Sequence, residues 1–162
     1  MQLLGSGTIL REVEAAAEML EKDWGVSADV WSATSFTELR REGLDCSRWN
    51  LFHAGDKPRV PYVTETLAKS TGPIIAATDY MKLFADQIRE FVPRRYTVLG
   101  TDGYGRSDTR TGLRHFFEVD RRYVTIAALK SLVDENQLDA KKVVEAMKKY
   151  GIDPNKPNPV TV

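Results

Sequence analysis

The spacing of apolar residues predicts strands and helices that alternate along the chain. Residues 2–5 form a short predicted strand, and after a glycine-containing turn apolar residues repeat at helical spacing from Val13 to Leu20, with Gly25 ending the helix. The outer side of this helix is expected to carry three acidic residues, Glu12, Glu14 and Glu18. The pattern therefore predicts a strand followed by an amphipathic helix.

Three more strands are predicted over residues 28–32, 74–78 and 96–100. Residues 74–78 form a continuous apolar run, which is typical of a strand buried on both faces of a parallel sheet. Between the second and third strands, the pattern predicts a helix over 36–43 and an irregular segment over 45–61.

Aspartates mark the expected starts of the later helices. Asp79 is predicted to cap a helix that Pro93 stops, and its inward side is expected to carry Met81, Phe84, Ile88 and Phe91. Asp120 and Asp139 are predicted caps of the last two helices, and Gly151 ends the second of them.

Strands separated by helices predict an α/β fold, with helices on both faces of a mainly parallel sheet. We expect one such domain over residues 1–153 and a loose or docked tail over 154–162.

Composition adds a few exclusions to this picture. With 42% hydrophobic residues, the 162-residue chain is long enough to bury one sizeable core. Its 23 basic and 23 acidic residues give a net charge of zero, so nothing attracts it globally to nucleic acid or to an anionic membrane. No apolar stretch approaches the roughly 18 residues of a membrane span, and no signal peptide is recognised, so a cytoplasmic location is expected. One cysteine and two histidines indicate neither a disulfide nor a structural metal site.

Two glycine-containing segments are candidates for ligand or partner contacts. Gly5-Ser6-Gly7 joins the first strand to a helix, where backbone N–H groups can bind phosphate. A dinucleotide fingerprint would need a third glycine where the chain has Leu10, which favours a tight structural turn.

The other segment follows the last predicted strand, at the edge where parallel sheets bind ligands and partners. It comprises Thr101, Asp102, Gly103, Tyr104, Gly105, Arg106, Ser107 and Asp108. One interpretation is an interface or partner contact. The other is an ordered loop held by its own salt links, in which Arg106 and Arg110 pair with Asp102 or Asp108.

The remaining reactive residue types do not assemble a catalytic set in the sequence. His53 and His115 are expected to be packing residues, and Cys46 is expected to be inert because acidic neighbours disfavour its thiolate. The pair Arg121-Arg122 is expected to be solvated or interfacial. We therefore predict no catalytic, cofactor-binding or metal-binding residue in this chain.

Five segments resemble, in the same order, the carboxyl-terminal domain of the homodimeric bacterial pyruvate dehydrogenase decarboxylating components, which are transketolase-like thiamine diphosphate enzymes. The segments are residues 3–13, 30–39, 58–62, 77–81 and 98–108. The resemblance covers practically the whole chain, and the last segment is specific to this branch of the enzymes. Tyr104 stands where the family commonly has phenylalanine, a change that keeps an aromatic ring.

The resemblance implies a three-layer fold with a mixed, mostly parallel sheet of about five strands. It also implies that thiamine diphosphate and magnesium bind in the full-length enzyme, between the amino-terminal domain of one subunit and the middle domain of the other. That enzyme decarboxylates pyruvate oxidatively and acetylates a lipoyl group. The motifs that bind the cofactor are missing here, so this domain is expected to bind none and to be inactive when isolated.

The resemblance further implies the partners of the domain. These are a second copy of the subunit, the amino-terminal and middle domains of the same chain, and the lipoyl-bearing acyltransferase component. Residues 101–108 are expected to help order the subunit interface and the channel region near the active site, and the early first strand indicates a domain of a longer chain. The alternative is a stand-alone α/β ligand-binding or regulatory module.

Overall fold

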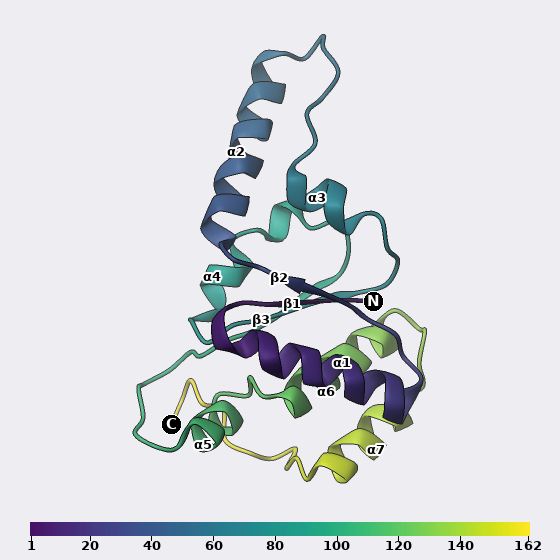
Figure 1. Ribbon diagram of the computed structural model, residues 1–162, viewed down its shortest axis with the longest axis vertical. Helices are drawn as coiled ribbons and strands as arrows, with labels where there is room; N and C mark the ends of the chain where they lie inside the picture. The colour runs from purple at the N-terminus through teal and green to yellow at the C-terminus, as the bar shows by residue number, and fades with distance from the viewer.

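The computed structural model describes residues 1–162 and contains one sheet of four parallel strands (Figure 1). The strands are β1 (Gln2–Gly5), β2 (Asp29–Ser32), β3 (Ile74–Ala77) and β4 (Tyr96–Leu99). They lie in the order β2-β1-β3-β4, and every neighbouring pair is parallel. The α/β class is therefore confirmed, with four strands in place of about five and a purely parallel sheet in place of a mixed one. The difference arises because the chain beyond β4 forms only helices and loops.

Helices cover both faces of the sheet and produce three layers (Figure 1). One face carries α1 (Leu10–Trp24), α6 (Arg121–Asp134) and α7 (Ala140–Tyr150). The other face carries α2 (Phe36–Phe52), α3 (Tyr62–Leu67) and α4 (Lys82–Asp86), and much of α2 projects away from the sheet. The remaining elements are α5 (Arg110–Phe116) and two 3-10 turns, η1 (Gly7–Ile9) and η2 (Arg89–Phe91). None of the helices is both long and apolar enough to cross a bilayer.

The alternation of side chains along the strands divides the core into two clusters. Leu3 and Ile75 belong to the cluster under α1 and α6, whereas Leu4 and Ile74 belong to the cluster on the opposite face. Successive strand residues point to opposite faces, and both faces are covered by helices, so every position of β1 and β3 is buried. This explains the continuous apolar run in residues 74–77.

The predicted helix ends are confirmed where they depend on local chemistry. The Asp120 carboxylate accepts a hydrogen bond from the backbone N–H of Arg122 at 2.9 Å, and Asp139 accepts one from Lys141 at 2.8 Å. Helix α7 ends at Gly151, which adopts a left-handed conformation with φ of 64°.

Two local predictions are wrong. Helix α2 continues to Phe52, because Gly43 does not break it. Gly43 lies against Phe91, and a Cβ atom there would be 2.6 Å from the Phe91 ring.

The second wrong prediction concerns Asp79, which does not cap a helix, since α4 begins only at Lys82. The segment after β3 is divided into α4 and η2 instead of forming one helix, so its apolar residues do not all lie on a single helix face. Among its expected inward residues, Ile88 and Phe91 are buried, whereas two are exposed: Met81 and Phe84.

Leu20 tests how far the core under α1 stabilises the fold. This side chain is fully buried, so Leu20→Ala should leave a cavity and lower the free energy of unfolding by about 2–5 kcal/mol. Urea denaturation followed by circular dichroism measures this change. Val144→Ala on the exposed side of α7 is the matched control and should change stability by less than about 0.5 kcal/mol. Equal effects of the two substitutions would contradict the assignment of the core.

Candidate functional site

A pocket of about 540 Å³ lies beyond the carboxyl ends of the strands, where parallel sheets usually bind ligands. Its apolar lining consists of Ile9, Leu113, Phe117 and Val119. Its other lining residues are Thr8, Asp79, Thr101, Gly103, Gly105, Arg106, Arg110 and Arg114. The pocket therefore brings the segment after β1 together with the loop after β4, two regions that the sequence singled out.

The turn after β1 is a packing feature. Gly5 lies so close to α1 that a Cβ atom on it would be 2.7 Å from the Cα of Leu10. Only glycine permits this approach of strand and helix, and the predicted tight turn is confirmed. The two residues that follow Gly7, Thr8 and Ile9, are the ones that line the pocket.

Backbone contacts anchor the start of the loop formed by residues 101–108. The Thr101 hydroxyl donates to the Asp79 carbonyl oxygen at 2.8 Å, and the Thr101 N–H donates to the Tyr80 carbonyl at 2.9 Å. The Asp102 carboxylate accepts from the Lys82 N–H at 3.0 Å. The loop is thus tied to the segment that follows β3, the neighbouring strand.

The carboxyl-terminal tail supports the same loop from another side. Gly103 has a φ of 109°, and a Cβ atom on it would overlap the carbonyl oxygen of the buried Pro159. Nearby, the Lys156 ammonium donates to the Phe116 carbonyl at 2.8 Å and pairs with Glu118 at 3.0 Å. Residues 154–162 therefore dock against the loop and the end of α5.

The interpretation of residues 101–108 as a loop held by its own salt links is wrong. Asp102 accepts from backbone, as described, and Asp108 accepts from the Thr109 N–H at 2.6 Å. The Arg106 guanidinium lies 4.2 Å from the centre of the Phe116 ring. The side chains of Arg106 and Arg110 enter no ion pair and no hydrogen bond, because both aspartates satisfy nearby backbone donors instead.

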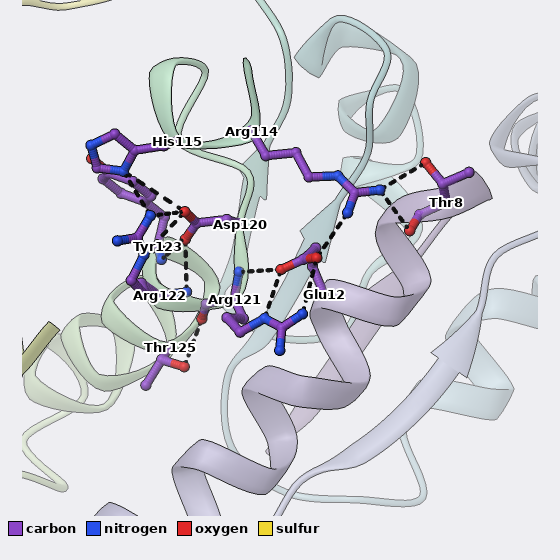
Figure 2. Close-up of polar contacts among 9 residues, drawn as sticks. All are labelled: Thr8, Glu12, Arg114, His115, Asp120, Arg121, Arg122, Tyr123 and Thr125. Carbon is purple, nitrogen blue, oxygen red and sulfur yellow. Dashed lines mark hydrogen bonds and ion pairs between the residues drawn. The ribbon is translucent and has the colours of Figure 1, made fainter. Parts of the chain in front are cut away.

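A buried carboxylate adjoins the pocket (Figure 2). Glu12 accepts from the guanidinium of Arg114 at 2.9 Å and from the side chain and backbone of Arg121 at 2.9 and 3.1 Å. The hydrogen bond from Arg121 is the main cause that lowers the pKa of Glu12 below its ordinary value. Arg114 also reaches the Thr8 hydroxyl at 3.2 Å, which connects this network to the pocket. The prediction that Glu12 faces outward is wrong, because its partners lie more than 100 residues away in sequence.

Asp120 forms the second part of this network. It pairs with Arg122 at 2.5 Å, and the Nδ1 atom of His115 lies 3.0 Å from the same guanidinium (Figure 2). Arg121 and Arg122 are therefore both held by internal carboxylates. Arg121 is nevertheless an exposed residue, as expected for a solvated side chain, whereas Arg122 is covered to a larger extent. His115 packs against the Tyr123 ring at 5.5 Å between centres, in agreement with a packing role.

The other reactive residues lie away from the pocket. His53 stacks on Trp49, with ring centres 4.2 Å apart. Cys46 is buried and donates to Glu42 at 3.2 Å; burial, with the Glu42 carboxylate as a further cause, raises the pKa of its thiol and disfavours the reactive thiolate. In the pocket itself, the Thr8 hydroxyl donates to the Asp79 carboxylate at 3.2 Å, and no histidine, cysteine or lysine belongs to the lining.

The residues of the chain do not fit a magnesium diphosphate site. Magnesium needs converging oxygen ligands, and no three aspartate, glutamate, histidine or cysteine side chains gather in a way that could hold a metal ion. The charged groups that the pocket offers a ligand are mainly guanidinium groups.

Comparison with known proteins identifies the class to which this fold belongs. The family model described as the transketolase-like TK C-terminal domain matches residues 1–120. The chain belongs to this family. A solved structure titled split gene transketolase, inactive beta4 tetramer, aligns with 82% of this chain and 39% of its own, with a TM-score of 0.55 and 18% identity, which supports the fold alone.

Closer relatives are pyruvate dehydrogenase E1 components. The protein from Cupriavidus necator is 63% identical over all 162 residues of the chain, and that from Escherichia coli K12 is 56% identical over 160 residues. The chain spans 18% of the length of each of these relatives. The recognition made from the sequence motifs is therefore confirmed.

Glu12→Gln tests the buried carboxylate. The substitution leaves two arginines without their anion and should lower the free energy of unfolding by about 1–3 kcal/mol at pH 7. Because folding lowers the pKa of Glu12, its contribution is present above its unfolded pKa of about 4.3 and is lost as the pH falls through the folded value. The difference between the two proteins, measured by urea denaturation, should therefore shrink as the solution is acidified.

The control for this experiment is Glu14→Gln, on the exposed side of the same helix. It should change stability by less than about 0.5 kcal/mol. A Glu12→Gln protein as stable as this control at pH 7 would show that the carboxylate contributes nothing.

Gly103→Ala tests the contact between loop and tail. Alanine would be strained at a φ of 109° and would displace Pro159, so we expect a loss of about 1–3 kcal/mol and faster hydrogen exchange in residues 101–108 and 156–162. Gly105→Ala is the matched control in the same loop, since nothing lies within 4 Å of its added Cβ atom. If both variants exchange like the parent protein, the tail does not restrain the loop.

Proposed function

We propose that this chain is the carboxyl-terminal domain of a pyruvate dehydrogenase E1 component and supports the dimer of that enzyme without carrying catalytic residues. The observation that carries the proposal is the 63% identity with the Cupriavidus necator protein along the entire chain. The alternative of a stand-alone ligand-binding or regulatory module is not favoured, because the relatives cited above share one name and their alignments span 98–100% of the chain.

The proposal assigns the chemistry to domains outside this chain. Those amino-terminal and middle domains would hold thiamine diphosphate and magnesium, and there the oxidative decarboxylation of pyruvate and the acetylation of a lipoyl group would take place. The pocket of this chain supports that division, because its lining is rich in arginines and contains no histidine, cysteine or lysine. This domain would instead stabilise the arrangement of the two subunits, so that their elements are correctly placed around the active site. We place the enzyme in the cytoplasm.

The loop formed by residues 101–108 is the segment that we expect to contact other parts of the enzyme. Tyr104 is 81% exposed, and the neighbouring segment after β3 leaves further large apolar side chains exposed, namely Tyr80, Met81, Leu83 and Phe84. Exposed apolar residues of this kind are typical of a surface that another protein segment covers. The loop is also tied to residues 79–82 and to Pro159, so it presents Tyr104 on a restrained backbone. We propose that it contacts the second subunit or the domains that line the active-site channel.

A domain exchange tests this function. The matching segment of the Cupriavidus necator E1 component would be replaced by this chain, and dimerisation and pyruvate-dependent turnover would be measured together with the acyltransferase component. We expect a dimer with at least about half of the parental turnover, because 63% of the exchanged residues are identical in the two proteins. A folded dimer without turnover would contradict the proposed function.

A double substitution in the same chimera tests the loop. Arg106→Ala with Asp108→Ala should weaken dimerisation or turnover at least about tenfold, or about 1.4 kcal/mol, if the loop contacts its neighbours. Lys141→Ala, an exposed residue at the start of α7, is the control and should leave both quantities unchanged. Unchanged values for the double variant would remove the loop from the interface without affecting the assignment of the domain.

A further inference from the structure

The pocket beyond the strands carries positive charge that the chain does not neutralise. Its lining contains three arginines and a single acid, Asp79. Arg114 shares the Glu12 carboxylate with Arg121, whereas Arg106 and Arg110 enter no ion pair. The side chains that surround the pocket therefore hold an excess of cationic groups with unused hydrogen-bond donors.

The shape and the remaining lining restrict what could neutralise this charge. A volume of about 540 Å³ is within the range of small-molecule sites. Leu113 and Phe117 add apolar surface to the lining. The Arg106 guanidinium is restrained by its contact with the Phe116 ring at 4.2 Å, so fixing it on a ligand costs less conformational entropy.

The loop backbone offers further donors. The N–H groups of Gly103 and Gly105 form no hydrogen bond within the chain, and both glycines line the pocket. Two unpaired guanidinium groups and free backbone N–H groups are suited to an oxyanion, which accepts several charge-assisted hydrogen bonds. The apolar lining is suited to a hydrocarbon body attached to that oxyanion.

We propose that this pocket binds a small organic anion, with a carboxylate or phosphate held by Arg106 and Arg110 and an apolar body against Leu113 and Phe117. The site is separate from the chemistry assigned to the complete enzyme and does not rest on the proposed function. Guanidinium groups bind planar carboxylates and phosphates in a bidentate manner, so the two head groups share the same recognition chemistry.

The test is a titration of the ¹⁵N-labelled 162-residue chain, followed by two-dimensional NMR, with phenyl phosphate, benzoate, inorganic phosphate and benzyl alcohol in separate experiments. We expect saturable shifts of the amide signals of Thr8, Gly103 and Gly105, with a Kd of about 1 mM or lower for at least one aromatic anion. The tighter of the two aromatic anions identifies the preferred head group. Inorganic phosphate should bind more weakly because it lacks the apolar body, and added salt should weaken binding of every anion.

Variants distinguish this pocket from nonspecific attraction. Arg106→Ala with Arg110→Ala should weaken binding at least about tenfold, which corresponds to about 1.4 kcal/mol. Arg106→Lys with Arg110→Lys keeps the charge but removes the planar fork, and should give an intermediate loss. Arg48→Ala, which removes an exposed arginine of α2 on the opposite side of the sheet, should leave the Kd unchanged.

Three results would overturn the proposal. They are benzyl alcohol binding as tightly as the aromatic anions, no saturation for either anion up to about 10 mM, and an alanine double variant that keeps the parental affinity. If the alanine double variant does not fold, the comparison between the lysine double variant and Arg48→Ala decides the question in the same way.

Discussion

The ion pairs of Glu12 with Arg114 and Arg121 are the interaction on which the carboxyl edge of this domain depends. Glu12 is buried within the first turn of α1, and a buried carboxylate is unfavourable unless cations and hydrogen-bond donors surround it. Its partners come from α5 and from the first residue of α6. The ion pair between Glu12 and Arg114 therefore holds α5 next to α1. Because α5 forms one wall of the pocket, the same buried charge also positions that wall.

The loop after β4 owes its order to contacts of a different kind. It is held at its base by the segment after β3 and at Gly103 by the tail, whereas its arginines remain unpaired. The backbone of the loop can thus be restrained while its charged and aromatic side chains stay available. This division of roles fits both a contact with neighbouring domains, through Tyr104, and an anion site, through Arg106 and Arg110. Arg106 belongs to both tests, so the variants that keep it, and those that change Arg110 or Asp108 beside it, separate the two roles.

Predictions from the sequence succeeded where the signal is local. The caps at Asp120 and Asp139 involve backbone N–H groups two residues away, and the buried strand at 74–77 is visible as an unbroken apolar run. They failed where a distant contact overrides the local pattern. Gly43 looks like a helix breaker until Phe91 occupies the space that its missing side chain leaves.

The sequence by itself determined the α/β class, the four strands, the end of α1, the caps of α6 and α7 and, through its motifs, the family. These features depend on residues that are near one another in the chain or on segments that are retained as units. Only the tertiary structure decided which charges are satisfied. Glu12 meets Arg121 across 109 residues, and Gly103 meets Pro159 only after the tail has folded back. Spacing along the chain carries no information about such pairs, since they form when separate elements pack on the same sheet. For the same reason, Arg106 and Arg110 could be recognised as unpaired, and the pocket as cationic, only in the folded protein.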